Sequence, residues 1–236
     1  GGLGLLTCRK LVEHGATQLM LSSRSGRVQR GSEMDWDWLA KCGITIRCVQ
    51  NDASNRLDVG AMIHRLHGQG WRLGGVFHAA GVLADALLAG QTAQHFLRVY
   101  GPKAQGAASL HLAAAHAPLS CFLAYSSVAS LLGSVGQAPH SAANSWLDAF
   151  AHWRRDAGRA GQCLQWGAVA EIGYAARHGA DTKAERTGSG AVTRAMACEA
   201  LEYALSTSMR LAAVLAAEWP KLFENSRRVP AFLTPH

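Results

Sequence analysis

Charged and aromatic residues are scarce in this chain of 236 residues, at 17% and 7% of the total, whereas 49% of the residues are hydrophobic. This composition differs from that of disordered or fibrous chains and favours a packed globular core. The longest uncharged apolar run near the C-terminus, Leu211–Ala217, falls well short of the roughly 20 residues that span a bilayer. No charged and then apolar leader opens the chain. We therefore expect neither a secreted nor a membrane protein.

The six cysteines and eleven histidines form none of the local patterns that mark metal sites or disulfide frameworks. No CxxC pair, zinc-knuckle spacing or HExxH motif occurs. Several cysteines lie within apolar stretches, where a reduced thiol behaves as a small hydrophobic group. We therefore expect free, mostly buried thiols, a reducing cytoplasmic location and no metal site.

Positive charge exceeds negative charge, with 23 lysines and arginines against 16 acidic residues and a net charge of +7. Such an excess can favour binding to nucleic acid, to an anionic membrane, or to a cofactor or carrier that bears phosphate. The basic residues are scattered, with local clusters only at Arg24–Arg30, Arg154–Arg159 and Arg227–Arg228. Because no basic helix stripe or aromatic-interleaved basic face occurs, we predict no nucleic-acid and no membrane partner.

Short apolar runs alternate with longer helical patterns along the whole chain. Runs typical of buried strands are 18–22, 44–49, 75–79, 121–126, 163–166 and 212–218. Helical patterns are 5–14, 57–66, 92–115, 142–155 and 191–206. This alternation implies βαβ units, and so a Rossmann-like, three-layer α/β fold with a doubly wound parallel sheet. The polar, glycine-containing segment 173–190 fits either a mobile loop over a site or a plain surface connection.

A glycine cluster, Gly1-Gly2-Leu3-Gly4, leads directly into the first helical pattern. In a doubly wound sheet such a cluster follows the first strand, where glycines let the backbone approach a pyrophosphate at the helix N-terminus. Since no strand precedes the cluster here, we expect the first strand to be missing. The chain 1–236 is then one domain, an N-terminally truncated fragment of a larger multidomain protein.

Residues suited to a dinucleotide stand at the ends of the next predicted strands. An arginine after the first of these strands, at Arg24, suits the 2′-phosphate of NADPH better than NADH, although a solvated arginine in a turn is the alternative. Asp52 follows the second strand, where an aspartate commonly faces the adenine, and small residues after the third leave room for a cofactor. The predicted cofactor-binding residues are Gly2, Gly4, Ser23, Arg24, Asp52, His78, Ala79, Ala80 and Gly81.

The segment 125–129, Tyr-Ser-Ser-Val-Ala, and the segment 136–144 after it carry the pattern on which the family resemblance depends. Together with the glycine cluster, 21–26, 78–81, 102–103 and 147–149, they make the sequence similar to the ketoreductase domains of modular type I polyketide synthases, in the short-chain dehydrogenase/reductase superfamily. The resemblance covers essentially the whole chain. It implies an NADPH-dependent enzyme that reduces a β-ketoacyl thioester to the β-hydroxyacyl form in polyketide or fatty acid biosynthesis. The implied partners are an acyl carrier protein with a phosphopantetheine-linked β-ketoacyl chain and other domains of the same synthase.

The resemblance also implies a catalytic set, with one departure. In the family a serine and a tyrosine bind the β-carbonyl oxygen, the tyrosine donates its proton, and a lysine and an asparagine complete the site. These positions hold Ser127, His140, Lys103 and Asn144, so histidine replaces the tyrosine. Histidine can act as a general acid near neutral pH, yet it is shorter than tyrosine, and a neighbouring Lys103 would disfavour its protonated form. Pro139 also fixes the backbone just before it.

Three hypotheses remain open from the sequence. The chain is a reductase, or a ketoreductase-like structural domain that does not reduce because of His140, or an independent short-chain dehydrogenase for small alcohols. The third hypothesis fits less well. Independent short-chain dehydrogenases resemble one another in a lysine four residues after the tyrosine, whereas this chain has Asn144 at that position. Asp85 retains the last residue of a Leu-Asp-Asp motif and hints at a D-configured product.

Overall fold

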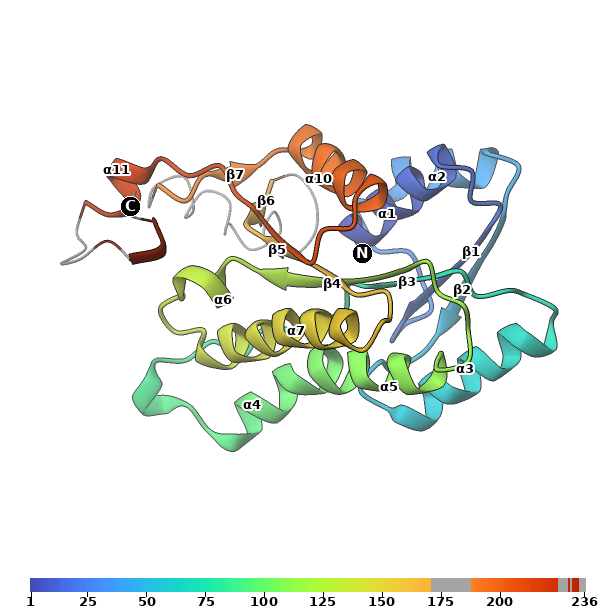
Figure 1. The fold of residues 1–236 in the computed structure, drawn as a ribbon, viewed down its shortest axis with the longest axis horizontal. Coiled ribbons are helices and arrows are strands. Elements are labelled where there is room, and N and C mark those ends of the chain that lie inside the picture. Colours follow the sequence, from blue (N-terminus) through green and yellow to red (C-terminus); the bar gives the residue numbers. More distant parts are fainter. Residues whose placement is uncertain (171–187, 225–228, 230, 234–236) are drawn as a thin grey trace.

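The protein, as a computed structural model, is described for residues 1–170, 188–224, 229 and 231–233. It has three layers, with helices on both faces of parallel strands (Figure 1), which confirms the predicted α/β class. The strands of the central layer are β1 (Gln18–Ser23), β2 (Thr45–Gln50), β3 (Gly75–His78), β4 (Cys121–Ser127), β5 (Gln162–Trp166) and β8 (Leu211–Val214). One face carries α1 (Gly2–Glu13), α2 (Glu33–Lys41) and α10 (Arg194–Ser206), and the other carries α3 (Arg56–Gly68), α5 (Gly106–Ala113) and α7 (Ala138–Asp156).

The central layer is divided into two parts. β3, β4, β5 and β8 form a four-stranded parallel sheet in that order, while β1 and β2 form a separate parallel pair. A smaller pair joins β6 (Ala168–Val169) to β7 (Ala191–Val192). A doubly wound sheet of strand order 3-2-1-4-5-6 would place one more strand between β1 and β3. The division therefore lies where the sequence predicts the missing strand.

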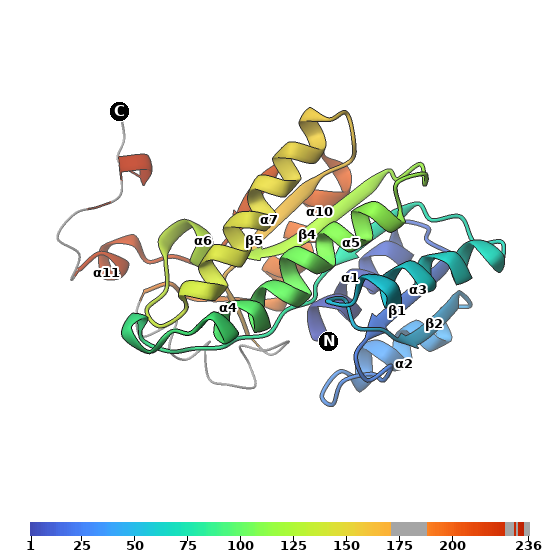
Figure 2. The ribbon, with the colours of Figure 1, turned by 90° about the horizontal axis from the view of Figure 1, so that it is seen from below.

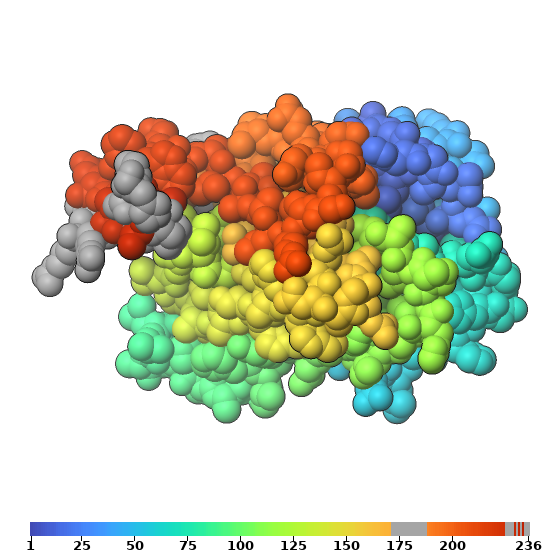
Figure 3. Space-filling view, in the orientation of Figure 1, coloured from blue at the N-terminus to red at the C-terminus, as the bar shows by residue number. Residues whose placement is uncertain are grey.

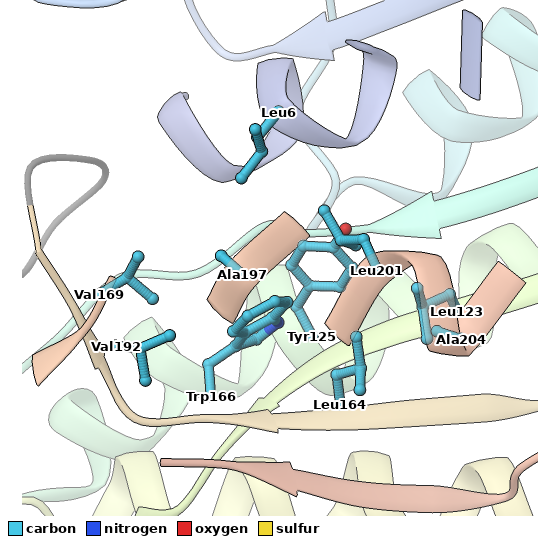
Figure 4. Packing of buried hydrophobic residues seen from close by; sticks show 10 residues of the cluster. All are labelled: Leu6, Leu123, Tyr125, Leu164, Trp166, Val169, Val192, Ala197, Leu201 and Ala204. Carbon is cyan, nitrogen blue, oxygen red and sulfur yellow. The ribbon is translucent and has the colours of Figure 1, made fainter. Parts of the chain in front are cut away.

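The main core lies between the four-stranded sheet and the helices α1 and α10. Figure 4 shows Tyr125 and Trp166 side by side in this core, with Leu6 of α1 on one side and Leu164 of β5 on the other. Unalternated burial of β5 agrees with a parallel strand covered on both faces. On the surface, α1 and α10 lie next to each other (Figure 3), and His14 of α1 pairs with Glu202 of α10.

Most predicted strands agree with the structure to within two residues, but four features differ. The predicted helix 92–115 is three successive elements: α4 (Ala93–Tyr100), a π-helical turn η2 (Gly101–Gln105) and α5. The predicted helix 191–206 begins with β7, and the predicted strand 212–218 ends at Val214, after which an irregular stretch leads to a short helix α11 (Trp219–Leu222). The helix α2 is new. The remaining short elements are η1 (Leu88–Gly90), α6 (Ala129–Leu132) and η3 (Ala231–Leu233).

Three further expectations concern single features. Residues 173–187 of the predicted loop 173–190 lie outside the described residues. All six cysteines are free thiols, but the expectation that most are buried is wrong, because only Cys8 and Cys163 are buried and Cys48 is exposed on the edge strand β2. Within the described ranges, no helix has the length and hydrophobicity needed to cross a bilayer.

Candidate active site

Lys103 is the charged centre of the site and is held by the π-helical turn. Only 6% of its surface is exposed, and its Nζ donates to the carbonyl oxygen of Tyr125 at 3.0 Å. A Cβ on Gly81 would lie 3.0 Å from the Lys103 Cε, so the glycine leaves the space that the lysine fills. Burial lowers the pKa of Lys103 to about 8, against the attraction of Cys163 and Asp148. This ammonium can therefore release a proton near neutral pH.

Ser127 is the last residue of β4, and Asn144 lies in the helix α7. Ser127 ends β4, and its Oγ accepts from the backbone N–H of Ala129 at 3.2 Å, which leaves the hydroxyl hydrogen free to point elsewhere. Asn144 is fully buried on α7 and donates to the His140 carbonyl oxygen at 2.8 Å. Its Oδ1 has no protein partner among the described residues. A buried amide oxygen of this kind is suited to a bound water.

His140 lies in the first turn of α7, with Pro139 before it. Its Nδ1 is buried and lacks a partner in the described part of the chain. Burial first, and then the positive charge of Lys103, lower the pKa of His140 to about 3. The ring is therefore neutral at physiological pH, with one nitrogen that donates and one that accepts. It cannot serve as an imidazolium acid there.

His78, at the end of β3, hydrogen-bonds to the backbone of Lys103. Its ring is 3% exposed, and Nε2 donates to the carbonyl oxygen of Lys103 at 3.0 Å. Burial lowers the pKa of His78 to about 4. The neutral ring thus fixes the backbone of the π-helical turn that carries the site lysine.

The two neutral histidines predict a loss of stability in acid. The unfolded chain binds a proton at each near pH 6.5, whereas the folded chain binds them only near pH 4 and 3. The free energy of unfolding therefore falls as the pH drops below 6.5, where only the unfolded chain takes up these protons, and this loss levels off below the folded pKa values. For His78 we expect the free energy of unfolding to fall by about 2 kcal/mol between pH 7 and pH 5. Urea unfolding of His78→Gln should show a shallower pH slope; an unchanged slope would contradict this assignment.

The predicted cofactor residues gather at the carboxyl ends of the strands. β1 pairs with β2 so that Ser23 lies opposite Gln50, which brings the exposed Arg24 near Asp52. Two hydrogen bonds from Ser54, and then the charge of Arg24, lower the pKa of Asp52. The N-cap residue of α1 is Gly1, which makes no side-chain cap hydrogen bond, so backbone N–H groups of this first turn suit a phosphate.

One cavity of about 1800 Å³ is lined both by the predicted cofactor residues and by predicted catalytic residues. Every predicted site residue lines this cavity except Asn144, which is fully buried. The predicted residues that line it are Gly2, Gly4, Ser23, Arg24, Asp52, His78, Ala79, Ala80, Gly81, Lys103, Ser127 and His140.

Among the described residues, no group of three or more histidines, cysteines and acidic residues could hold a metal ion.

Two buried polar residues beneath the site were not predicted to act there. Asp148 of α7 accepts from the Gln165 Nε2 at 2.8 Å and from the Cys163 Sγ at 3.2 Å. Its charge favours the protonated form of Lys103. Gln165 also donates to the Ser130 Oγ at 2.9 Å, which ties β5 to the turn after β4. The signal in the sequence was a glutamine inside a buried strand and an aspartate on the apolar face of a helix.

The site lies in a part of the chain that matches known proteins. A family model described as "KR domain" matches residues 1–171. A mycocerosic acid synthase-like polyketide synthase of Mycobacterium tuberculosis is 40% identical over 217 residues, which are 89% of this chain and 9% of the relative.

Solved structures agree with the sequence matches. A structure titled as A-type ketoreductases from a modular polyketide synthase superposes with a TM-score of 0.92 at 31% identity, over 99% of this chain and 50% of that one. A ketoreductase from the first module of phoslactomycin biosynthesis in Streptomyces sp. HK803 gives 0.89 at 28% identity, over 98% and 54%. The chain thus spans about half of these solved chains and about a tenth of the curated relative.

Proposed function

The chain belongs to the KR domain family of the polyketide synthases, a family of oxidoreductases, and from this membership we propose that it reduces a β-ketoacyl thioester with NADPH. The observation that carries the proposal is the common cavity. Lys103, Ser127 and His140 line the same space as the strand ends that would hold a dinucleotide. A substrate carbonyl and a nicotinamide can therefore meet there.

The residues of this chain fit such a cofactor. Gly81 leaves no room for a side chain beside Lys103, and a Cβ on Gly4 would meet open space at the uncapped start of α1. The guanidinium of Arg24 can pair with a 2′-phosphate. When bound, NADPH supplies the hydride that reduces the β-carbon.

The side chains then provide polarisation and the proton. The Ser127 hydroxyl and the N–H of neutral His140 can both donate to the carbonyl oxygen and stabilise the charge that develops on it. Because His140 is neutral, the proton must come from another acid, and the Lys103 ammonium is suited by its pKa of about 8. A neutral imidazole can accept that proton at one nitrogen and release another from the second nitrogen to the alkoxide, so protons balance. We therefore propose a slow reductase.

A second candidate function is favoured by the same histidine. With its pKa lowered to about 3, His140 offers no acid of its own. A domain that binds NADPH but does not reduce would serve as a structural part of the synthase. The test is to incubate the chain with NADPH and a β-ketoacyl thioester of N-acetylcysteamine, and to look for the β-hydroxyacyl product by mass spectrometry. Product above the enzyme-free control supports the reductase, and its absence supports the structural domain.

The proposed partners follow from the chemistry of the substrate. The β-ketoacyl chain would arrive on the phosphopantetheine arm of an acyl carrier protein, within a cytoplasmic multidomain synthase. The net charge of +7 suits an acidic carrier. Asp85, which accepts from the Gln137 Nε2 at 3.1 Å, lies on the cavity wall where it can bias product configuration.

Arg24 gives a prediction on cofactor choice. Removal of a charge-assisted contact to the 2′-phosphate should weaken NADPH binding about tenfold in Arg24→Glu and leave NADH binding nearly unchanged. Arg30→Glu makes the same charge change at an exposed position that does not line the cavity. Fluorescence titration with both nucleotides measures the effect. Equal losses in the two variants, or equal losses for the two nucleotides, would refute a specific role for Arg24.

A further inference from the structure

Buried hydrogen bonds connect Asp148 of α7 with the turn that follows β4. Asp148 accepts from the Nε2 of Gln165 at 2.8 Å, and the same nitrogen donates to the Oγ of Ser130 at 2.9 Å. The Ser130 Oγ in turn donates to the carbonyl oxygen of Ser127 at 2.7 Å. Figure 2 shows why these residues can meet, because α7 lies along β4 and β5 and α6 lies beside its N-terminal end. We call these three bonds the Asp148 network.

Asp148 fixes the direction of each bond in this network. Only 9% of its surface and 4% of that of Gln165 are exposed, so bulk water does not compete for their hydrogen bonds. A carboxylate only accepts, so the nitrogen of the Gln165 amide, and not its oxygen, must face Asp148. The second hydrogen of that nitrogen points to Ser130, whose Oγ accepts it and directs its own hydrogen to the Ser127 carbonyl. A buried network whose members are all bonded in this way is rigid.

Both oxygens of the Asp148 carboxylate are bonded to side chains of β5. One accepts from Gln165, and the other accepts from the Sγ of Cys163 at 3.2 Å. In the described part of the chain, no lysine, arginine or histidine forms an ion pair with Asp148. Burial of a carboxylate without an ion pair costs stability that an apolar side chain would not cost. A role for Asp148 in the site explains its place here better than a contribution to stability does.

The turn that the network holds presents Ser127 to the cavity. Ser127 lines the cavity, and its Oγ accepts from the backbone N–H of Ala129 at 3.2 Å. The backbone N–H of Val128 donates to the Trp166 carbonyl at 3.0 Å, so the same turn is also held from β5. Ser130 follows Ala129 directly and binds the Ser127 carbonyl. Loss of this bond would let the Ser127 hydroxyl and the Ala129 N–H move apart, and the hydroxyl would no longer be aimed.

We propose that Asp148 is a positioning residue: by orienting the amide of Gln165, it holds the turn in which Ser127 can donate to the substrate carbonyl. The inference rests on the proposed function, because Ser127 is the hydroxyl that would bind this carbonyl. It adds a second group of residues to the site, namely Asp148, Gln165 and Ser130. None of these three lines the cavity, so they act through Ser127 and do not touch the substrate.

Ser130→Ala is the variant that isolates this role. It breaks the bond to the Ser127 carbonyl but keeps Asp148, whose charge also favours the protonated form of Lys103. Ser130→Thr retains the hydroxyl and is the conservative variant. Ser145→Ala is the matched control, because it removes a serine hydroxyl that donates to a carbonyl of its own helix at 3.0 Å, at an exposed position on α7. Circular dichroism and the Tm show whether each variant is folded.

The first measurement is amide exchange of residues 128–133 by NMR, without NADPH or thioester. Exchange should be about fivefold faster in Ser130→Ala, because a hydrogen bond that holds the turn is lost. Asp148→Asn should act in the same direction, since a neutral amide can present oxygen or nitrogen to Gln165 and no longer fixes its direction. Ser130→Thr and Ser145→Ala should match the natural protein. Exchange at the natural rate in either Ser130→Ala or Asp148→Asn would overturn the proposal.

The second measurement is the reduction of a β-ketoacyl thioester. Ser130→Ala should lower kcat about fivefold and leave the KM for NADPH and for thioester nearly unchanged, and Ser130→Thr should restore kcat. In a Ser127→Ala background, Ser130→Ala should cause no further loss, because the hydroxyl through which it acts is absent. Equal losses in both backgrounds would overturn the proposal. If the natural protein forms no product, the proposed function fails, whereas amide exchange still decides whether the Asp148 network holds the turn.

Discussion

His140→Tyr should raise the rate of β-ketoacyl thioester reduction by about 10²-fold or more. A positioned general acid contributes 10²–10⁴ to such a step, and the neutral ring of His140 supplies none of its own. A phenol at this position would lie near the Lys103 ammonium, which stabilises its anion. His140 lines the cavity, so a longer ring can extend into open space. The measurement is NADPH oxidation at saturating thioester, followed for both forms.

The matched control is His140→Phe, which has a ring of similar size to tyrosine without the hydroxyl. It should show no gain, and product should fall below the natural form because the N–H donor to the carbonyl is lost. A gain of equal size in the phenylalanine and tyrosine variants would mean that packing, and not proton donation, limits the natural chain. No gain in the tyrosine variant would mean that the acid is not what the site lacks.

Lys103→Met should reduce turnover by at least about 10²-fold in the natural background, because it removes the proposed proton source. The natural chain should also lose activity as the pH rises through about 8, since the acidic form of Lys103 is the ammonium and exists below its pKa. Below that pH, activity should level off. Lys41→Met, an exposed residue at the end of α2, is the control and should leave the profile unchanged.

The lysine variant needs a check on folding, because Lys103 also donates to the Tyr125 carbonyl. Circular dichroism and NADPH binding serve this purpose. A folded Lys103→Met that retains both the natural rate and the decline above pH 8 would exclude Lys103 as the proton source. When Lys103→Met is combined with His140→Tyr, turnover should fall by a smaller factor than in the natural background if the phenol itself donates the proton.

The sequence predicted most of the strands well, because buried parallel strands read as short apolar runs, and it placed the predicted site residues at the ends of those strands, where they line one cavity. The helix 92–115 shows why the local geometry of the lysine was not predictable. Its apolar pattern continues through Gly101 and Pro102, yet the chain there forms a π-helical turn, a feature often found at functional sites. That turn directs Lys103 into the cavity and aligns its carbonyl with His78. Pro102 inside a helical pattern was the available signal.

The neutral state of His140 and the formation of α2 both depend on tertiary burial, which sequence patterns did not show. The family resemblance predicts His140 at the position of a tyrosine, but the neutral state of this ring depends on its burial and on the nearby charge of Lys103. The helix α2 lacks a clear apolar stripe, since charged residues and tryptophans alternate in it. It forms because Leu39 packs against α1 and Asp35 pairs with Arg194 of α10. Both contacts come from residues distant in the sequence.

The most direct test of the account is hydride transfer from NADPH carrying deuterium at the transferable position of the nicotinamide. The natural chain and His140→Tyr are each incubated with a β-ketoacyl thioester, and the product is analysed by mass spectrometry. We predict a β-hydroxyacyl product with deuterium on the β-carbon from both forms, at a rate about 10²-fold lower for the natural chain. Absence of deuterated product from both forms, with NADPH bound, would contradict the assignment of this domain as a reductase.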